Sequence, residues 1–204
     1  SPGHRECMIG NNSISLLTDA WMKGIRTICP EKALEAMIHQ TEARHPGISS
    51  VGRDGFGYYD RLGYVPYPEV HEATAKTLEY AYADWCVARF ADSIGRKEIA
   101  DTYYRKALNY RNLYYPDYGF MWAKDANGKW RDAFDATEWG GPFTEGSSWH
   151  WTWSVLHDPE GLSRLMGGHT AMEARLDSMF TAPNTYNYGT YGFVIHEIAE
   201  MVAL

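Results

Sequence analysis

The chain has 204 residues, of which 45% are hydrophobic, so it can bury a sizeable core in one large domain or two small ones. Its net charge is −7 and its basic residues are scattered, which argues against a protein that binds nucleic acid or an anionic membrane. No stretch reaches the roughly 18 apolar residues of a membrane span. Aromatic residues are abundant, with 8 Trp, 15 Tyr and 7 Phe, and we expect some of these rings to line a groove.

Cysteine and histidine give no sign of a disulfide framework or a metal site. Cys7, Cys29 and Cys86 are odd in number and lack metal-like spacing. The chain has neither an initiating methionine nor a signal peptide and stops inside an amphipathic run, so we expect it to be a piece of a longer protein. Metal binding is also disfavoured for the histidines, because no close pair with ligand spacing occurs among His4, His71, His150, His157, His169 and His196.

Two amphipathic helices are expected near the start of the chain. Behind Asn12 as the cap, apolar residues recur at three- and four-residue spacing as far as Ile25. A second helix begins with Pro30 at its first position and ends near His45. Residues 47–68 are rich in glycine and tyrosine and have no helical period, so we interpret them as a long functional loop.

The strongest helical periodicity follows, over residues 73–95 and 96–116, and predicts an antiparallel helical hairpin. Such a hairpin could be one unit of a tetratricopeptide-like array that binds peptides. Arrays of this kind need at least about three units at a fixed period, and no second copy occurs, which disfavours this alternative. In the first helix, the residues that share a face are Leu78, Tyr82, Trp85 and Phe90.

The remainder of the chain combines a second long loop with short helices. Residues 116–151 are dense in Asp, Gly and Trp, and helices are expected at 160–166, at 171–180 and from residue 192 to the end. Helix pairs joined by long aromatic and acidic loops, without clear strands, predict an all-α toroid or solenoid.

The stretch "FTEGSSWHWTW" sets one carboxylate, Glu145, among tryptophans. A carboxylate held beside indole rings lies partly out of water, which favours its acid form and suits a proton donor. The alternative is that the tryptophans are ordinary core residues and Glu145 a surface turn residue. Elsewhere in the sequence, neither a nucleophile elbow nor a phosphate-binding loop is found, since "GRDGFG" at residues 52–57 lacks the lysine and the helix-opening context of such loops.

Acidic groups and aromatic rings together are typical of sugar hydrolysis. One acid donates a proton to the leaving oxygen, a second acts as base or nucleophile, and an aromatic face packs on the sugar ring. Most acids in such loops are nevertheless expected to be solvated turn residues or caps. The acids of the two loops are Asp54, Asp60, Asp132, Asp135, Glu138 and Glu145.

Several stretches together resemble the catalytic domain of glycoside hydrolase family 92, the calcium-dependent exo-acting α-mannosidases. They include "GRDGFGYYDRLGYVP", "TAKTLEYAYADWCVARFA", "YRKALNYRNLYYPDYGFMWAKDANGKW" and "FTEGSSWHWTWSVLHDPEGLSRLMGG", in the family's order. The resemblance implies an N-terminal β-sandwich followed by an (α/α)6 barrel with long active-site loops. Residues 1–204 would then be part of that barrel, with the sandwich and the rest of the barrel outside this chain.

The resemblance also implies roles for individual residues. Glu145 corresponds to the family's general acid, and Trp149 and His150 would shape the sugar pocket. Asp54 resembles a position that hydrogen-bonds hydroxyls of the terminal mannose, although Arg53 and Asp54 could equally form a local ion pair that braces the loop. The family run is closer to "TEGNAWQYTW", so Ser147 and His150 depart from it, and we expect these departures to alter the linkage or leaving-group preference.

The implied reaction inverts the anomeric centre and releases terminal α-linked mannose, with α-1,2 the expected linkage. The family's base and calcium ligands lie beyond Leu204, so we expect calcium in the full-length protein and no activity from this chain alone. The expected partners are mannose-containing oligosaccharides and the remaining parts of the parent chain, outside the cytoplasm. A relative that only binds mannose-rich glycans is the alternative.

Overall fold

The computed structural model describes residues 9–47, 51–182 and 187, and the described part of the chain is mainly helical. The two short strands pair antiparallel, with Tyr114 opposite Met121. The expected helix from residue 192 onward, Cys7, His4 and His196 lie outside the described residues. In chain order the elements are α1 (Asn12–Met22), α2 (Pro30–Gln40), α3 (Phe56–Leu62), α4 (Ala73–Ser93), α5 (Lys97–Lys106), the 3₁₀ helix η1 (Ala107–Leu113), β1 (Tyr114–Tyr115), β2 (Phe120–Met121), α6 (Ser148–Trp151), α7 (Pro159–Met166) and α8 (His169–Thr181).

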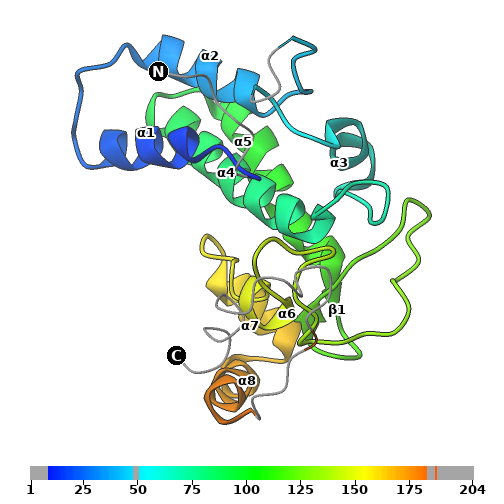
Figure 1. Ribbon diagram of the computed structural model, residues 1–204. Helices are drawn as coiled ribbons and strands as arrows, with labels where there is room; N and C mark the ends of the chain where they lie inside the picture. Colours follow the sequence, from blue (N-terminus) through cyan, green and yellow to red (C-terminus); the bar gives the residue numbers. More distant parts are fainter. Residues whose placement is uncertain (1–8, 48–50, 183–186, 188–204) are drawn as a thin grey trace.

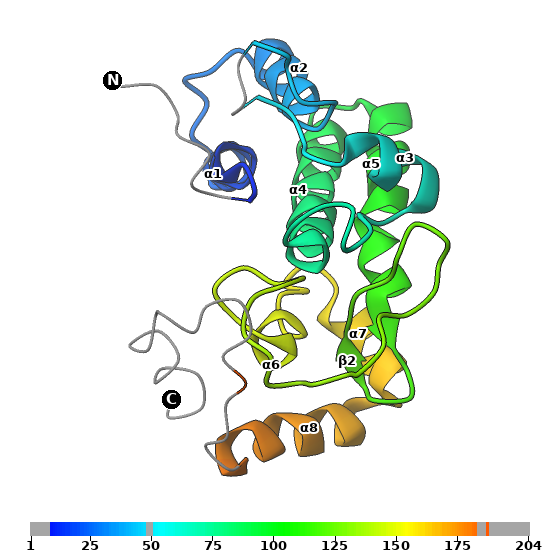
Figure 2. The ribbon, with the colours of Figure 1, turned by 45° about the vertical axis from the view of Figure 1, so that its right-hand side comes forward.

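The elements form two tiers, which Figure 1 shows one above the other. Helices α1 to α5 make the upper tier, and α6, α7, α8 and the β-hairpin make the lower one. Figure 2 shows α4 between α1 and α5. No helix in the part of the chain that the structure describes is long and apolar enough to cross a membrane.

Helix α4 is the centre of the fold. It packs against α1, α2, α5 and η1. Of the face expected from the sequence, Leu78 and Phe90 are buried, whereas Tyr82 and Trp85 are only partly so. The expectation of one buried face was too narrow, because small residues such as Ala81 and Ala88 let neighbouring elements approach α4 on its other sides.

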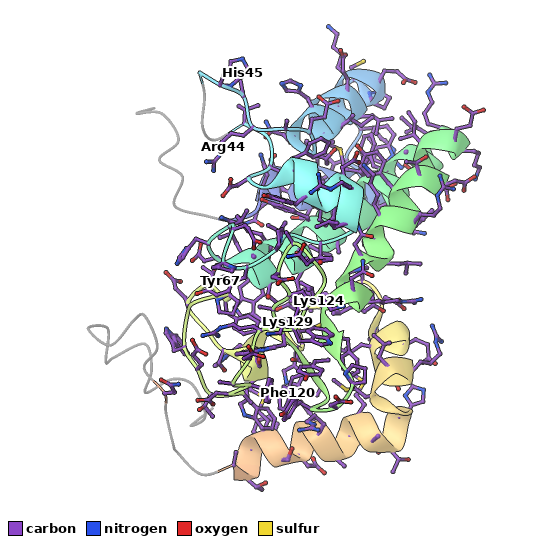
Figure 3. The ribbon with its side chains drawn as sticks, turned by 90° about the vertical axis from the view of Figure 1, so that its right-hand side faces the viewer. Arg44, His45, Tyr67, Phe120, Lys124 and Lys129 are labelled. Atoms are coloured by element: carbon purple, nitrogen blue, oxygen red, sulfur yellow. The ribbon has the colours of Figure 1, made fainter. Side chains whose placement is uncertain are left out.

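One apolar cluster stabilises the upper tier, and a second joins the two tiers. The upper cluster joins α1, α2, α4 and α5, and the lower one joins α4, η1 and β2 to the segment around α7. The loop after β2 is also tied to the segment before α4, because the Tyr67 N–H donates to the Lys124 carbonyl at 2.8 Å. The Tyr64 hydroxyl donates to the Asp125 carbonyl, also at 2.8 Å. Figure 3 labels Tyr67 and Lys124 between the two tiers.

Some boundaries differ from those expected. The helix predicted to reach residue 116 ends at Lys106 and tightens into η1 before the β-hairpin. Tyr115 precedes Pro116, and a residue before proline favours extended backbone, so the chain must leave the helix there. Helix α3 lies within the segment expected to be irregular. Its flanking glycines, Gly55 and Gly63, have φ angles of 70° and 74° and cap the helix at both ends.

The remaining helices follow the predictions closely. Helix α1 is capped by Asn11, whose side chain accepts from the Ser13 N–H, so the cap is one residue earlier than expected. Pro30 opens α2, as predicted, but the helix ends at Gln40. These elements confirm the all-α class, whereas the closed (α/α)6 barrel stays a prediction. The described cysteines, Cys29 and Cys86, are free thiols.

Candidate active site

Glu145 lies in a tightly turned loop, residues 139–147, which we call the acid loop. Its two ends are joined because the Gly140 N–H donates to the Gly146 carbonyl at 2.9 Å. The indole N–H of Trp151 donates to the Thr144 carbonyl at 2.8 Å, immediately before the acid. The backbone on either side of Glu145 is therefore held by hydrogen bonds.

The acid loop also caps the N-terminus of α4. The first N–H groups of a helix have no partner within the helix. Here the Pro142 carbonyl accepts from the Thr74 and Ala75 N–H groups at 3.0 and 3.2 Å, and the Gly141 carbonyl accepts from the Glu72 N–H at 3.2 Å. These contacts fix the acid loop to the central helix.

On its other side the acid loop leads into α6, which is fastened to β2. The Ser148 hydroxyl donates to the Met121 carbonyl, and the Met121 N–H donates to the Thr152 hydroxyl, each at 2.9 Å. Ser147 caps α6: its hydroxyl accepts from the Trp149 N–H at 3.2 Å, and His150 Nδ1 accepts from the Ser147 N–H at 3.2 Å. His150 thus contributes to the start of the helix.

Glu145 itself has an unusual backbone. Its φ angle is +43°, in the left-handed region that residues other than glycine rarely adopt. Such strain persists only where the surroundings impose it, and it is concentrated at functional sites. The side chain is exposed, so the expected shielding from water by indole rings is not present among the described residues.

Glu145 lines a cavity of about 350 Å³. A second carboxylate, Glu79 from α4, lines the same cavity, and the sequence analysis missed it. Its only signal was an acidic side chain between two residues of a core helix, Leu78 and Tyr80, both of which are buried. Burial raises the pKa of Glu79 above its usual range. The remaining lining residues are Ile9, Gly10, Asn12, Thr144, His150 and Trp151.

The structure brings His150, but not Trp149, to this cavity. The His150 ring stands edge-on to Trp139, with ring centroids 5.2 Å apart. The Trp149 ring packs edge-on against Phe120 at 4.7 Å. Figure 3 labels Phe120, which lies just above α8 in that view. Trp151 is the indole that lines the cavity instead, and the expected sugar contact of Trp149 stays a prediction.

Asp54 lies at a different hollow, which shares no lining residue with the cavity of Glu145. Its carboxylate accepts a hydrogen bond from Lys76 Nζ at 2.8 Å. Burial alone would raise the pKa of Asp54, but the hydrogen bond and charge of Lys76, helped by Arg44, outweigh burial and lower it. The local ion pair considered between Arg53 and Asp54 is not formed, because Arg53 pairs with Asp84.

The other acids of the two loops are accounted for by structural contacts. Glu138 forms a two-pronged ion pair with Arg131, at 2.7 and 2.9 Å. Asp135 accepts from the Thr137 N–H at 2.8 Å, as a turn residue does. Salt bridges at the protein surface join Asp60 to Lys106 and Asp132 to Lys129.

The part of the chain that the structure describes contains no cluster of metal-binding side chains. Within residues 9–47, 51–182 and 187, no group of three or more His, Cys, Asp or Glu side chains could hold a metal ion.

Comparison with known proteins identifies the family. The Glycosyl hydrolase family 92 catalytic domain matches residues 1–200, so the chain belongs to this family. A solved inverting mannosidase of family GH92 from Bacteroides thetaiotaomicron VPI-5482 is 83% identical, with a TM-score of 0.86, over 100% of this chain and 28% of that one. A GH92 α-mannosidase from Bacteroides thetaiotaomicron, solved with mannoimidazole, is 31% identical, with a TM-score of 0.80, over 89% of this chain and 24% of that one.

A curated relative is also a glycosidase by name. A secreted glycosidase of Arthroderma benhamiae, described as uncharacterized, is 27% identical over 200 residues, which is 82% of this chain and 26% of that protein. The chain therefore spans about a quarter of the length of these relatives, between 24% and 28%. Family membership confirms the resemblance found in the sequence and replaces the tetratricopeptide-like alternative.

Proposed function

We propose that the full-length protein carrying this chain is a glycoside hydrolase that removes terminal α-linked mannose, with Glu145 as its general acid. One observation carries the proposal: Glu145 has strained backbone, is held by hydrogen bonds on both sides and lines a cavity. The two bacterial relatives of known structure described above are mannosidases. A proton donor gains from such fixed placement because the proton must reach one particular oxygen atom.

In this proposal each part of the site has a separate task. Glu145 gives its proton to the glycosidic oxygen as the bond to the terminal sugar breaks. Trp151 contacts the apolar face of a sugar ring and holds the acid loop through Thr144. His150 lines the cavity from the start of α6, where its ring can face the leaving group. The exposed Glu145 becomes shielded from water when substrate fills the cavity.

The inverting course, the α-1,2 linkage and the calcium requirement are further parts of the proposal. An inverting hydrolase needs a second carboxylate, roughly 6.5–9.5 Å from the acid, that activates water on the opposite side of the sugar. The relative that is 83% identical is titled an inverting mannosidase. Following the family resemblance, we assign the base and the calcium ligands to residues beyond Leu204 and expect the chain alone to be inactive.

Mannose-containing oligosaccharides are the proposed substrates, and a secreted, periplasmic or cell-surface location is the proposed compartment. The relative from Arthroderma benhamiae is titled a secreted glycosidase, which supports this location. The (α/α)6 barrel belongs to the same proposal, supported by the helical hairpin of α4 and α5 and by the likeness to the two bacterial mannosidases.

The test measures mannose release by the full-length protein from α-1,2-, α-1,3- and α-1,6-mannobiosides, with calcium and with chelator. Glu145→Gln should reduce kcat at least 100-fold, because general acid catalysis contributes about 10²- to 10⁴-fold. The matched control is Glu173→Gln, an exposed acid on α8 that should leave the rate unchanged. Following the released anomer by proton NMR distinguishes inversion from retention.

Each outcome decides between the alternatives. Release of β-mannose that needs both calcium and Glu145 supports the whole proposal. Binding of the same disaccharides without any release would contradict it and support the glycan-binding alternative. Release that survives Glu145→Gln would leave a hydrolase but remove Glu145 from the role of acid.

A further inference from the structure

Glu79 shares the cavity with Glu145 but comes from a different element. It projects from the second turn of α4, the central helix, whereas Glu145 lies on the acid loop that caps the same helix. The residues on either side of Glu79, Leu78 and Tyr80, are buried, so its backbone is firmly placed. Two carboxylates therefore face one space from two directions that the fold fixes.

Glu79 differs from the other acids of α4 in having no hydrogen-bond or ion-pair partner in the part of the chain that the structure describes. Asp84 pairs with Arg53, and Asp92 with Lys97. Within the described residues, no hydrogen bond or ion pair to the Glu79 carboxylate is found. A charge taken partly out of water without a partner destabilises a protein. A partner supplied by a bound molecule would offset this cost, and the opening beside Glu79 is where such a molecule would enter.

The lining of the cavity fits a sugar ring. A carboxylate accepts hydrogen bonds from hydroxyl groups, and charge-assisted bonds of this kind are about twice as strong as neutral ones. Asn12 and Thr144 add polar side chains, and Trp151 adds an aromatic one. The volume, about 350 Å³, lies in the range of small-ligand pockets.

We propose that Glu79 binds hydroxyl groups of the sugar next to the glycosidic bond that Glu145 protonates, and so helps to determine which linkage is accepted. This inference rests on the proposed function, because it assumes a saccharide in the cavity. In this proposal Glu79 contacts the substrate directly, because its side chain and that of Glu145 line the same cavity.

The test uses Glu79→Gln and Glu79→Leu in the full-length protein, with Glu173→Gln as the control. The dissociation constants of α-1,2-, α-1,3- and α-1,6-mannobiosides are measured by titration calorimetry in variants that also carry Glu145→Gln. KM and kcat are measured in variants that keep Glu145. Glu79→Leu should weaken binding of the preferred mannobioside about tenfold or more, and Glu79→Gln by less, since the amide oxygen still accepts. The melting temperature should not fall.

Two results would overturn the inference. One is unchanged dissociation constants in both variants. The other is a loss of kcat with KM unchanged and rescue by azide, which would make Glu79 a general base. If the mannobiosides bind through Glu79 but are never hydrolysed, the proposed function fails while this inference stands. If hydrolysis requires Glu145 but the dissociation constants do not change when Glu79 is replaced, only this inference fails. If no mannobioside binds, the inference and the proposed function both fail.

Discussion

Arg53 and Asp84 form a buried ion pair, with Arg53 Nη2 2.8 Å from Asp84 Oδ1. The Tyr59 hydroxyl donates to the other oxygen of Asp84 at 2.8 Å, and Arg53 also donates to the Tyr80 carbonyl at 3.1 Å. Burial by itself lowers the pKa of Arg53, but the charge and hydrogen bond of Asp84, together with Tyr59 and Tyr80, outweigh burial and raise it. This network ties the segment before α3 to the middle of α4.

Replacing Arg53 by methionine should destabilise the protein strongly. Removal of one partner from a buried ion pair leaves the other charge uncompensated, at a cost of about 3–5 kcal/mol. We expect a lower melting temperature of the full-length protein by circular dichroism and faster hydrogen exchange in α4. The control is Arg96→Met, because the pair between Arg96 and Glu31 is about half exposed, with side chains 51% and 53% accessible, and should matter little. Equal effects of the two variants would contradict the prediction.

Trp151→Phe should reduce activity more than stability. The substitution keeps a ring beside the cavity but removes the indole N–H that binds the Thr144 carbonyl at 2.8 Å, next to the proposed acid. We expect kcat of the full-length enzyme to fall about tenfold, since even small displacements of a catalytic group are costly. Trp130→Phe is the control, because Trp130 stacks on Tyr115 away from the acid loop, with ring centroids 4.4 Å apart. An unchanged kcat would show that the acid loop holds without this bond.

Much of the helical fold could be predicted because its signals are local. The start of α2 follows from Pro30, and the end of α4 from Gly95, whose φ angle is 79°. The β-hairpin could not be predicted, since each strand has only two residues and depends on pairing across the turn. Helix α3 was not predicted, because glycines such as Gly55 and Gly63 usually indicate a loop. In this protein they cap a short helix.

The candidate site was predictable only in part, for a similar reason. Glu145 was found because its neighbours along the chain are unusual. Glu79 was not found, because its cavity is made by residues distant in sequence, such as Gly10 and Thr144. The partners of Arg53 and Asp54 could not be predicted either, because these partners, Asp84 and Lys76, lie on α4, distant in sequence. Adjacency in sequence pointed instead to a pair that the protein does not form.

His150→Gln should change the preference for linkage without loosening α6. Glutamine at this helical position can accept from the Ser147 N–H, as His150 Nδ1 does at 3.2 Å, so the capping box is retained. The side chain at the cavity changes, however, and we expect altered ratios of kcat/KM among the three mannobiosides. The comparison is His150→Ala, which removes the acceptor for the Ser147 N–H and so breaks the capping box. This variant should also lower the melting temperature. The double variant Ser147→Asn with His150→Gln places the residues of the family run at these two positions, and an unchanged linkage profile would reject the idea.

Asp54→Asn should reveal whether this residue braces the loop or contacts sugar. The pKa of Asp54 is lowered below its usual 3.8 in spite of burial, chiefly by Lys76, so the folded protein holds this proton less tightly than the unfolded chain. The stability that Asp54 contributes is therefore complete above about pH 3.8 and is lost as the pH falls through the lower, folded value. Asp54→Asn should lower the melting temperature near pH 7, with the difference shrinking below pH 4, because Lys76 loses its partner.

The matched control for Asp54 is Asp132→Asn. Asp132 pairs with Lys129, and the two side chains are 83% and 68% accessible, respectively. This substitution should therefore shift the melting temperature little at any pH. The same proteins are then assayed on the preferred mannobioside. If Asp54 only braces the loop through Lys76, KM stays unchanged while the melting temperature falls. A rise in KM with an unchanged melting temperature would instead support the contact with mannose hydroxyls that the family resemblance implies, and would place Asp54 beside the substrate in the full-length protein.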